Sequence, residues 1–450
     1  MHRHDVRHSG STKAAVPAKV ERLWQAELGG RLSQPVVVGD RLYVAQADAH
    51  RVVCLNAADG KPVWSFTAGG RVDSSPTLHR GLALFGSHDG FVYAVRASDG
   101  ALAWRFRAAP TERRVVAFGQ LESAWPVPGT VLVLGGLAYV SAGRSSYLDG
   151  GIRVYGLDPA TGRVVHQGRI EGPYPDVKED PGRPFDMEGT FADVLGTDGE
   201  FLYMQQVQLD RSLEQIEAPR ITKMGDRKVG RHVFSTAGLL NGAYWNRTFM
   251  TYCERWPGFY IANQAPKTGQ LLVVGDDATY AVKCYTRRNR HSPMFFPGEG
   301  YILFADDNDN EPVLYDGTGA KPLRWLPDVN KAIGHTLAMN AVDRDKGTGF
   351  TRVKPPKWAH RVPVRVRAMV LAGGTLFIAG PPDALEEGDE LAAFQGRAGA
   401  MLWAVSAKDG QKLSELKLDS PPVFDGLAAA GGRLWLSTLA GKVLCLGDAK

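Results

Sequence analysis

Short apolar runs, separated by polar turns that contain glycine, recur along the chain at a nearly regular interval. Residues 51–66 (RVVCLNAADGKPVWSF) and 91–106 (FVYAVRASDGALAWRF) each combine an apolar strand, an Asp-Gly turn and a second strand with tryptophan. Glycine adopts positive φ without steric cost, so Asp-Gly favours a tight turn between strands. Gly100 follows Gly60 by about 40 positions, a period typical of β-propeller blades.

Further stretches carry the same pattern with weaker turn signals. Copies occupy residues 154–166, 313–325 and 402–416. Four short strands are predicted in each of residues 34–66, 75–106 and 126–170, and two more blades in residues 364–418 and 422–446. Residues 190–285 are rich in strand residues but lack the turn signature, so they predict one or two blades, and residues 301–325 return to the signature. The pattern therefore predicts an all-β fold, an eight-bladed β-propeller of four-stranded antiparallel blades with very little helix, and seven blades as the alternative.

The two ends of the chain complement each other. Residues 21–28 (ERLWQAEL) resemble the second half of the repeat without a first half, while residues 433–446 supply strands that no tryptophan strand follows. We predict that the N-terminal strand completes the last blade, which pairs two otherwise exposed sheet edges. The polar residues 1–20, with His2, His4 and His8, are predicted to be a flexible tail, and residues 21–450 a single propeller domain.

Composition excludes some classes of protein. The chain has 450 residues, of which 22% are charged and 44% hydrophobic, and a net charge of +5, which is small for this length. No basic-aromatic module is present, so a nucleic-acid surface is not predicted. The sequence contains no apolar run of about 18 residues, so no membrane span is predicted, and its start lacks the apolar core of a signal peptide.

The cysteines and acidic runs give no metal or redox motif. Cys54, Cys253, Cys284 and Cys445 are widely spaced and form no CxxC pair. A Cys253–Cys284 disulfide stays open, because spacing alone does not determine pairing. Residues 306–311 (DDNDNE) alternate oxygen-bearing side chains but lack the glycine and distal glutamate of a calcium loop, so a hairpin turn is the predicted structure and no metal site is assigned.

The repeats resemble the pyrroloquinoline-quinone (PQQ)-type propeller repeat, whose signature is Leu-Asp-x-x-Thr-Gly-x-x-x-Trp. The run Leu157-Asp158-Pro159-Ala160-Thr161-Gly162 carries the first part, and the spacings from Gly60 to Trp64 and from Gly100 to Trp104 carry the second. Residues 1–10 also resemble the segment that precedes such propellers in secreted bacterial proteins. The resemblance implies that each tryptophan packs between blades and that the protein is periplasmic or otherwise extracytoplasmic.

The same resemblance bears on cofactors. Quinoprotein alcohol dehydrogenases resemble this fold and carry an adjacent Cys-Cys disulfide over a quinone held by calcium. This chain has no Cys-Cys pair, and it has no motif that matches their calcium ligands or catalytic aspartate. The cofactor is therefore unknown: PQQ with calcium remains an option that no motif supports.

Propellers usually form sites at one mouth of the central channel, from residues just before or within the innermost strands. The polar and aromatic residues at such positions are Asp73, Glu122, Trp125, Asp186, Glu188, Trp245, Arg247, Arg365, Arg367 and Asp425. If they converge, carboxylates for acid–base work, arginines for an anion and indoles for stacking meet at one mouth. The alternative is that each caps a strand or pairs with its neighbour.

Two classes of function follow from these residues. The first is a non-catalytic propeller scaffold that binds a small molecule, a glycan or a protein at the channel mouth. The second is an enzyme, either a quinoprotein-type oxidoreductase or a carbohydrate lyase or hydrolase that uses carboxylates and arginine at the same mouth. The catalytic residues, if any, are unknown from the sequence. Many intact blade signatures without a complete catalytic motif favour the scaffold.

Overall fold

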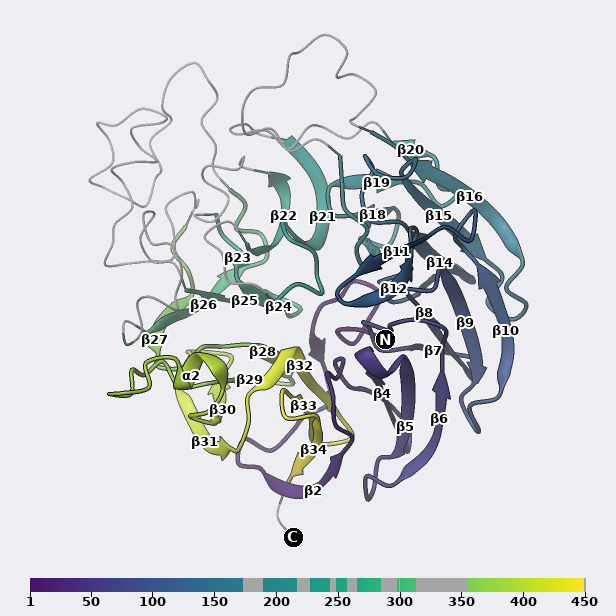
Figure 1. Cartoon of the computed structure of the whole chain (residues 1–450). Helices are drawn as coiled ribbons and strands as arrows, with labels where there is room; N and C mark the ends of the chain where they lie inside the picture. Colours follow the sequence, from purple (N-terminus) through teal and green to yellow (C-terminus); the bar gives the residue numbers. More distant parts are fainter. Residues whose placement is uncertain are drawn as a thin grey trace, which may run out of the picture.

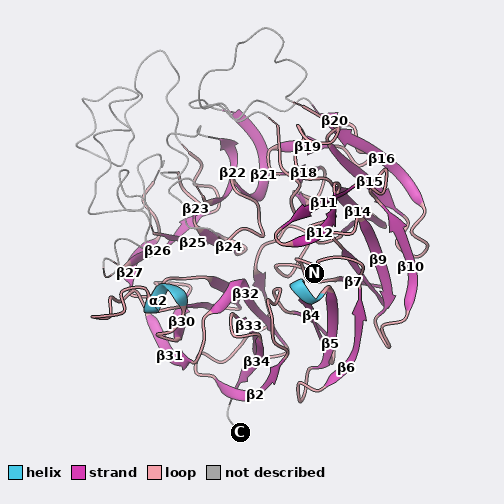
Figure 2. Cartoon of the chain, in the orientation of Figure 1, coloured by secondary structure: helices cyan, strands magenta, loops and turns pink. Residues whose placement is uncertain are grey.

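The repeats close into a ring of antiparallel sheets in the computed structural model (Figure 1). The structure describes residues 1–172, 189–216, 227–242, 248–256, 265–284, 298, 300–312 and 354–448. These residues form the eight sheets of an eight-bladed propeller, so the predicted fold is confirmed. Its only described helical turns are η1 (Ala47–Ala49) and α2 (Ala392–Gln395), visible as two short cyan segments in Figure 2.

The first four blades follow one another along the chain, each with its first strand innermost. Blade 1 consists of β3 (Val36–Val38), β4 (Arg41–Gln46), β5 (Arg51–Asn56) and β6 (Pro62–Thr67). Blade 2 consists of β7 (Thr77–His79), β8 (Leu82–Gly86), β9 (Phe91–Arg96) and β10 (Leu102–Arg107). Blade 3 consists of β13 (Leu132–Leu134), β14 (Leu137–Ala142), β15 (Ile152–Leu157) and β16 (Val164–Ile170). Blade 4 consists of β17 (Gly196–Thr197), β18 (Leu202–Met204), β19 (Val207–Leu209) and β20 (Gln215–Ile216).

The other four blades complete the ring. Blade 5 has three described strands, β21 (Arg227–Ser235), β22 (Met250–Trp256) and β23 (Thr268–Gly269). Blade 6 consists of β24 (Leu271–Val274), β25 (Ala278–Lys283), β26 (Tyr301–Asp307) and β27 (Trp358–Val362). Blade 7 consists of β28 (Ala368–Ala372), β29 (Thr375–Gly380), β30 (Ala400–Ser406) and β31 (Lys412–Leu418). Blade 8 joins β32 (Pro422–Ala430), β33 (Arg433–Thr438) and β34 (Lys442–Gly447) to β2 (Glu21–Glu27).

The ring closes as predicted, through the pairing of β2 with β34. The two strands run antiparallel, with Trp24 opposite Cys445 and Ala26 opposite Val443. The middle strands of each blade are buried on both faces, whereas outer strands such as β16 alternate between half-buried and exposed residues. This pattern places the hydrophobic core between neighbouring blades.

A tryptophan on the outer strand of one blade packs on the turn glycine of the next. At Gly100, an added Cβ would lie 2.7 Å from the Trp64 ring, and the Trp64 indole N–H donates to the Ala97 carbonyl over 2.9 Å. Glycine is required there both for this close approach and for its φ of 75°. The same contact joins Trp24 to Gly60, Trp104 to Gly162 and Trp358 to Gly410.

One sequence expectation is not tested in this region, and one open question is answered. The weak copy at residues 313–325 lies outside the described residues, and Trp358 on β27, which the repeat pattern did not identify, makes the inter-blade contact of blade 6. All four cysteines are free, so the described Cys253 and Cys284 are not joined.

Candidate functional site

Six of the ten candidate residues, Arg365 among them, lie in the described part of the chain. Asp73, Glu122 and Trp125 lie in the connections between blades 1, 2 and 3, while Arg367 and Asp425 belong to blades 7 and 8. Asp186, Glu188, Trp245 and Arg247 lie outside the described residues. The convergence of the full predicted set therefore stays a prediction.

Asp73 and Glu122 lie close together, joined by His88, which the sequence reasoning missed. The His88 Nε2 atom lies 2.9 Å from Asp73 Oδ2, and its Nδ1 atom lies 3.0 Å from Glu122 Oε2. The turn between β8 and β9 positions His88, and its Ser-His-Asp-Gly sequence signals only a turn. One imidazole therefore bridges two carboxylates from different connections.

Two arginines complete this group. Arg71 places its Nε atom 3.0 Å from Asp73 Oδ1 and its Nη1 atom 3.3 Å from Glu122 Oε1. Arg144 places Nη2 2.8 Å from Glu122 Oε2. We call these residues the mouth cluster: Arg71, Asp73, His88, Glu122 and Arg144. Arg31, which is half exposed, adds a contact of 2.7 Å to Asp73 at its edge.

Burial and charge together set the ionisation of the mouth cluster. Burial opposes the charged forms, but the hydrogen bonds to Asp73 and Glu122 raise the pKa of His88. In the same way, despite burial, contacts with His88 and the arginines lower the pKa of Asp73 to about 2 and lower that of Glu122. Both carboxylates are therefore ionised at neutral pH and neutralised by the chain's own cations, so neither is poised to exchange a proton.

The raised pKa of His88 makes a stability prediction. The charged imidazole stabilises the folded state fully below the unfolded pKa of about 6.5, and this contribution is lost as the pH rises through the folded value. We expect the thermal unfolding midpoint to fall more for the wild type than for His88→Gln between about pH 6 and about pH 9. His360→Gln, on the outer strand β27, is the control and should follow the wild type. Parallel curves for the wild type and His88→Gln would contradict the prediction.

A two-stranded hairpin covers the mouth cluster. It consists of β11 (Arg114–Ala117) and β12 (Gln120–Ser123), inserted between blades 2 and 3, and lies near the middle of the ring in Figure 1. Val115 and Glu122 are opposite each other and face the protein, where Val115 packs against the core. The next pair, Val116 and Leu121, faces solvent.

The outer face of the hairpin is apolar. Val116 is 79% exposed, Phe118 at the turn 78% and Leu121 56%. A strand that is buried on one face usually carries polar residues on the other, so this pattern is the reverse of the ordinary one. Exposed apolar groups of this kind mark interaction surfaces.

Trp125 does not face the mouth as a free indole. Its side chain is buried, and its Nε1–H donates to the Asp149 carbonyl over 3.0 Å. The residue thus fastens the hairpin's exit to the connection between β14 and β15. Trp125 therefore positions the hairpin. Its buried ring does not contribute to a ligand surface among the described residues.

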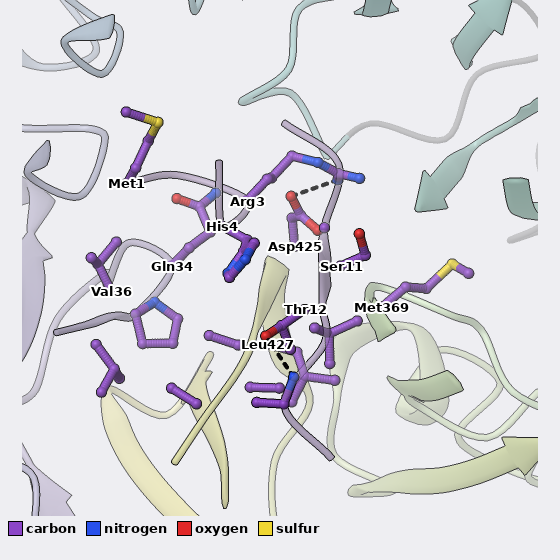
Figure 3. Close-up of a pocket in the computed structure, with 18 of the residues that line it drawn as sticks. Met1, Arg3, His4, Ser11, Thr12, Gln34, Val36, Met369, Asp425 and Leu427 are labelled. Atoms are coloured by element: carbon purple, nitrogen blue, oxygen red, sulfur yellow. Dashed lines mark hydrogen bonds and ion pairs between the residues drawn. The ribbon is translucent and has the colours of Figure 1, made fainter. Parts of the chain in front are cut away.

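The N-terminal residues do not form a separate tail. His2, Arg3 and His8 are buried in the channel, and β1 (Ser11–Thr12) pairs in parallel with β28. The Arg3 Nη1 atom lies 2.7 Å from Asp425 Oδ2, and Arg3 also donates to the Leu272 and His8 carbonyls (Figure 3). The expected flexible tail therefore differs from the structure over residues 1–12, because Arg3 has a buried carboxylate partner that no local pattern identifies.

Asp425 faces this segment and not the mouth cluster. Burial raises its pKa, which the Arg3 contact opposes. A cavity of about 330 Å³ adjoins the pair, between the N-terminal segment and the inner strands β3, β28 and β32. Arg3, Gln34, Met369, Asp425 and Leu427 are among its walls (Figure 3).

The two arginines of the 365–367 stretch have partners elsewhere. Arg365 Nε lies 3.3 Å from Asp383 Oδ1, and both side chains are buried. Arg367 donates to the Pro422 carbonyl over 3.2 Å. For these two residues the structure matches the alternative in which each pairs with a neighbour.

Asp193, which the sequence reasoning did not single out, precedes β17 as Asp73 precedes β7. Burial raises the pKa of its carboxyl to about 6, although the backbone N–H groups of Val194 and Leu239 donate to it. The position of Asp193 before an inner strand is the one signal in the sequence. That strand is hard to recognise, because β17 has only two residues.

The described residues do not fit a quinone with its calcium. No three His, Cys, Asp or Glu side chains group as metal ligands in the described ranges, and the buried Asp425 carboxylate is bound to Arg3. The N-terminal segment passes through the channel beside it. We therefore assign no quinone chemistry to these residues. No described helix is long and apolar enough to span a membrane.

The closed ring, with its tryptophan–glycine contacts, defines the class: an eight-bladed β-propeller. Residues 10–209 match the family model described as outer membrane protein assembly factor BamB, which confirms the predicted repeat over that part of the chain. No curated protein sequence matches the chain.

Solved structures share this fold at low sequence identity. A europium-containing methanol dehydrogenase is similar with a TM-score of 0.56 and 12% identity over 100% of this chain and 97% of that one. Quinohemoprotein alcohol dehydrogenase from Comamonas testosteroni has a TM-score of 0.51 and 13% identity, over 99% and 80% of the two chains. BamB from Moraxella catarrhalis has a TM-score of 0.48 and 13% identity, over 96% and 98%. The first two support the propeller fold and do not distinguish a scaffold from an enzyme.

Proposed function

We propose that the chain is a non-catalytic binding scaffold whose partner contacts the mouth face over the β11–β12 hairpin. The observation that carries this proposal is the state of the three predicted carboxylates that lie in the described part of the chain. Asp73, Glu122 and Asp425 are each bound to cations of the chain itself, at 2.7 to 3.3 Å. A lyase or hydrolase at this mouth needs at least one carboxylate free to exchange a proton, and a scaffold does not.

The apolar outer face of the hairpin favours a protein as the partner. Val116, Phe118 and Leu121 offer the kind of contact that anchors protein interfaces, next to exposed Arg113 and Arg114. The match of residues 10–209 to a family described as an outer membrane protein assembly factor supports a protein partner and an extracytoplasmic location. Both belong to the proposal.

The double variant Val116→Ser/Leu121→Ser tests this function. We expect loss of at least about 2 kcal/mol of binding free energy, which is about thirtyfold in affinity, because both apolar contacts are removed from one face. The measurement is recovery of cross-linked complexes from cells that naturally produce the protein, followed by affinity determination with the recovered partner.

The matched control is Val63→Ser/Leu102→Ser. These residues are similarly apolar and exposed, at 40% and 48%, but lie on the outer strands of blades 1 and 2. Equal binding by both double variants would refute a partner on the hairpin. Turnover of a polysaccharide or an alcohol by the wild type, abolished by Glu122→Gln, would favour the enzyme alternatives.

A further inference from the structure

Three cationic side chains of the propeller body converge on one carboxylate of the hairpin. We propose that Arg71, His88 and Arg144 form a binding site for an oxyanion, a carboxylate or a phosphate, and that Glu122 occupies this site in the structure. The inference goes beyond the scaffold proposal because it names a ligand chemistry, and it does not require a protein partner.

The site belongs to the propeller and not to the hairpin. Arg71 comes from the β6–β7 connection, His88 from the β8–β9 turn and Arg144 from the β14–β15 connection, whereas Glu122 alone comes from β12. The Arg71 and His88 side chains are only 5% and 4% exposed. Buried arginines with fixed positions are suited to bind planar or tetrahedral oxyanions through paired N–H donors.

The charges favour an anion once Glu122 is removed. Asp73 is then the one remaining carboxylate of the mouth cluster, and it contacts Arg71 and a His88 whose charged form it stabilises. Arg31 adds positive charge at the edge, and Asp48 partly neutralises it at 3.4 Å. The buried Arg144 Nε–H has no hydrogen-bond partner among the described residues. Removal of Glu122 leaves the Arg144 guanidinium, which is 23% exposed, without its carboxylate, so an incoming anion restores a charge pair there.

The hairpin has a limited set of contacts besides those of Glu122. Val115 packs on the core, Gln120 pairs with His50 at 2.7 Å, and the Ser123 N–H donates to the His88 carbonyl over 2.7 Å. The Arg71 guanidinium lies 4.3 Å from the centre of the Phe118 ring, and Arg144 also donates to the Ser123 carbonyl over 3.2 Å. At its base, Arg113 pairs with Asp149 at 2.6 Å. A two-stranded hairpin is marginal in isolation, so the ion pairs of Glu122 contribute substantially to its position. An oxyanion that replaces Glu122 releases the hairpin. Because the hairpin carries the apolar outer face, anion binding then changes the position of that face.

Chemical rescue of Glu122→Ala tests the site. The variant leaves the three cations without their carboxylate, and we expect inorganic phosphate to raise its thermal midpoint above that in chloride at equal ionic strength. The apparent affinity of Glu122→Ala for phosphate should be at least about tenfold higher than that of the wild type. In the wild type, the attached Glu122 carboxylate competes for the site at a millimolar effective concentration. Acetate in a parallel arm distinguishes a carboxylate ligand from a phosphate ligand.

Two variants separate this site from general salt effects. Glu122→Ala/Arg144→Ala should lose the rescue, and Glu27→Ala, which removes an exposed carboxylate 3.0 Å from Lys442, should show none. An unchanged midpoint of folded Glu122→Ala in phosphate and acetate would overturn the proposal. So would a rescue that persists without Arg144.

Hydrogen exchange of the wild type provides a second measurement if Glu122→Ala does not fold. Phosphate should accelerate exchange of the amides in β11 and β12 several-fold, with β9 and β10 unchanged as internal controls. Exchange in the hairpin that is independent of phosphate would overturn the proposal. This readout needs no binding partner, so its failure leaves the scaffold proposal standing.

Discussion

Replacing Trp24 by alanine is expected to destabilise the junction that closes the ring. The indole packs on Gly60, donates to the Ala57 carbonyl over 3.2 Å and meets the Trp435 ring edge-on at 5.8 Å. Its loss should lower the free energy of unfolding by about 3 kcal/mol, the lower end for a tryptophan because the side chain is half-buried. Chemical denaturation followed by circular dichroism measures this difference.

The expected loss is specific to ring closure. Leu23 is adjacent on β2 and 40% exposed, so Leu23→Ala should change stability by about 0.5 kcal/mol or less. Trp24→Ala should also make β2 and β34 exchange amide hydrogens faster than the central strands of blade 2, because the closing pair of strands loses its anchor. Equal stabilities for Trp24→Ala and Leu23→Ala would show that the contact contributes little.

Arg3→Met should have an effect of similar or larger size, and one that depends on pH. The change leaves the buried Asp425 carboxylate without its partner at 2.7 Å, which costs about 3–5 kcal/mol at neutral pH. Burial already raises the pKa of Asp425, and removing Arg3 raises it further. A carboxyl with a raised folded pKa binds a proton in the folded state first, so the variant should regain stability as the pH falls through that value and lose it as the pH rises.

The double variant Arg3→Met/Asp425→Asn provides the control. It removes both charges, so its stability should exceed that of Arg3→Met at neutral pH and lack the acid-side recovery. Arg22→Met, which removes an exposed partner of Asp419, should leave stability nearly unchanged. If the loss of stability in Arg3→Met does not depend on pH, the unpaired Asp425 carboxylate is not its cause.

The fold could be predicted where local signals coincide. Blades 1 to 3 combine turn glycines with a tryptophan or its equivalent, and the unmatched halves at residues 21–28 and 433–446 indicated the closure that the β2–β34 pairing confirms. Blades 4 and 5 lack those signals, and β17 and β20 have only two residues each. Their pairing depends on contacts between distant segments, which a local pattern does not contain.

The site could be predicted only in part, for a related reason. Asp73 and Glu122 were found because they precede inner strands, but His88, which connects them, occupies a turn whose sequence reads as turn chemistry. Arg3 was assigned to a tail because its neighbours in the sequence are polar. Its partner Asp425 lies more than four hundred positions away, so only the folded structure shows this ion pair. Partnership between remote charged residues is the information that the linear pattern lacks.

The tryptophan–glycine contact has a bearing on how such rings change in size. Each contact takes its ring from one blade and its glycine from the following blade, as Trp64 and Gly100 do. A duplicated unit that spans one blade therefore carries the turn glycine at one border and the tryptophan at the other. Growth or shortening by whole units that carry this contact at both borders leaves the adjoining junctions chemically the same, whereas an insertion of partial length breaks one.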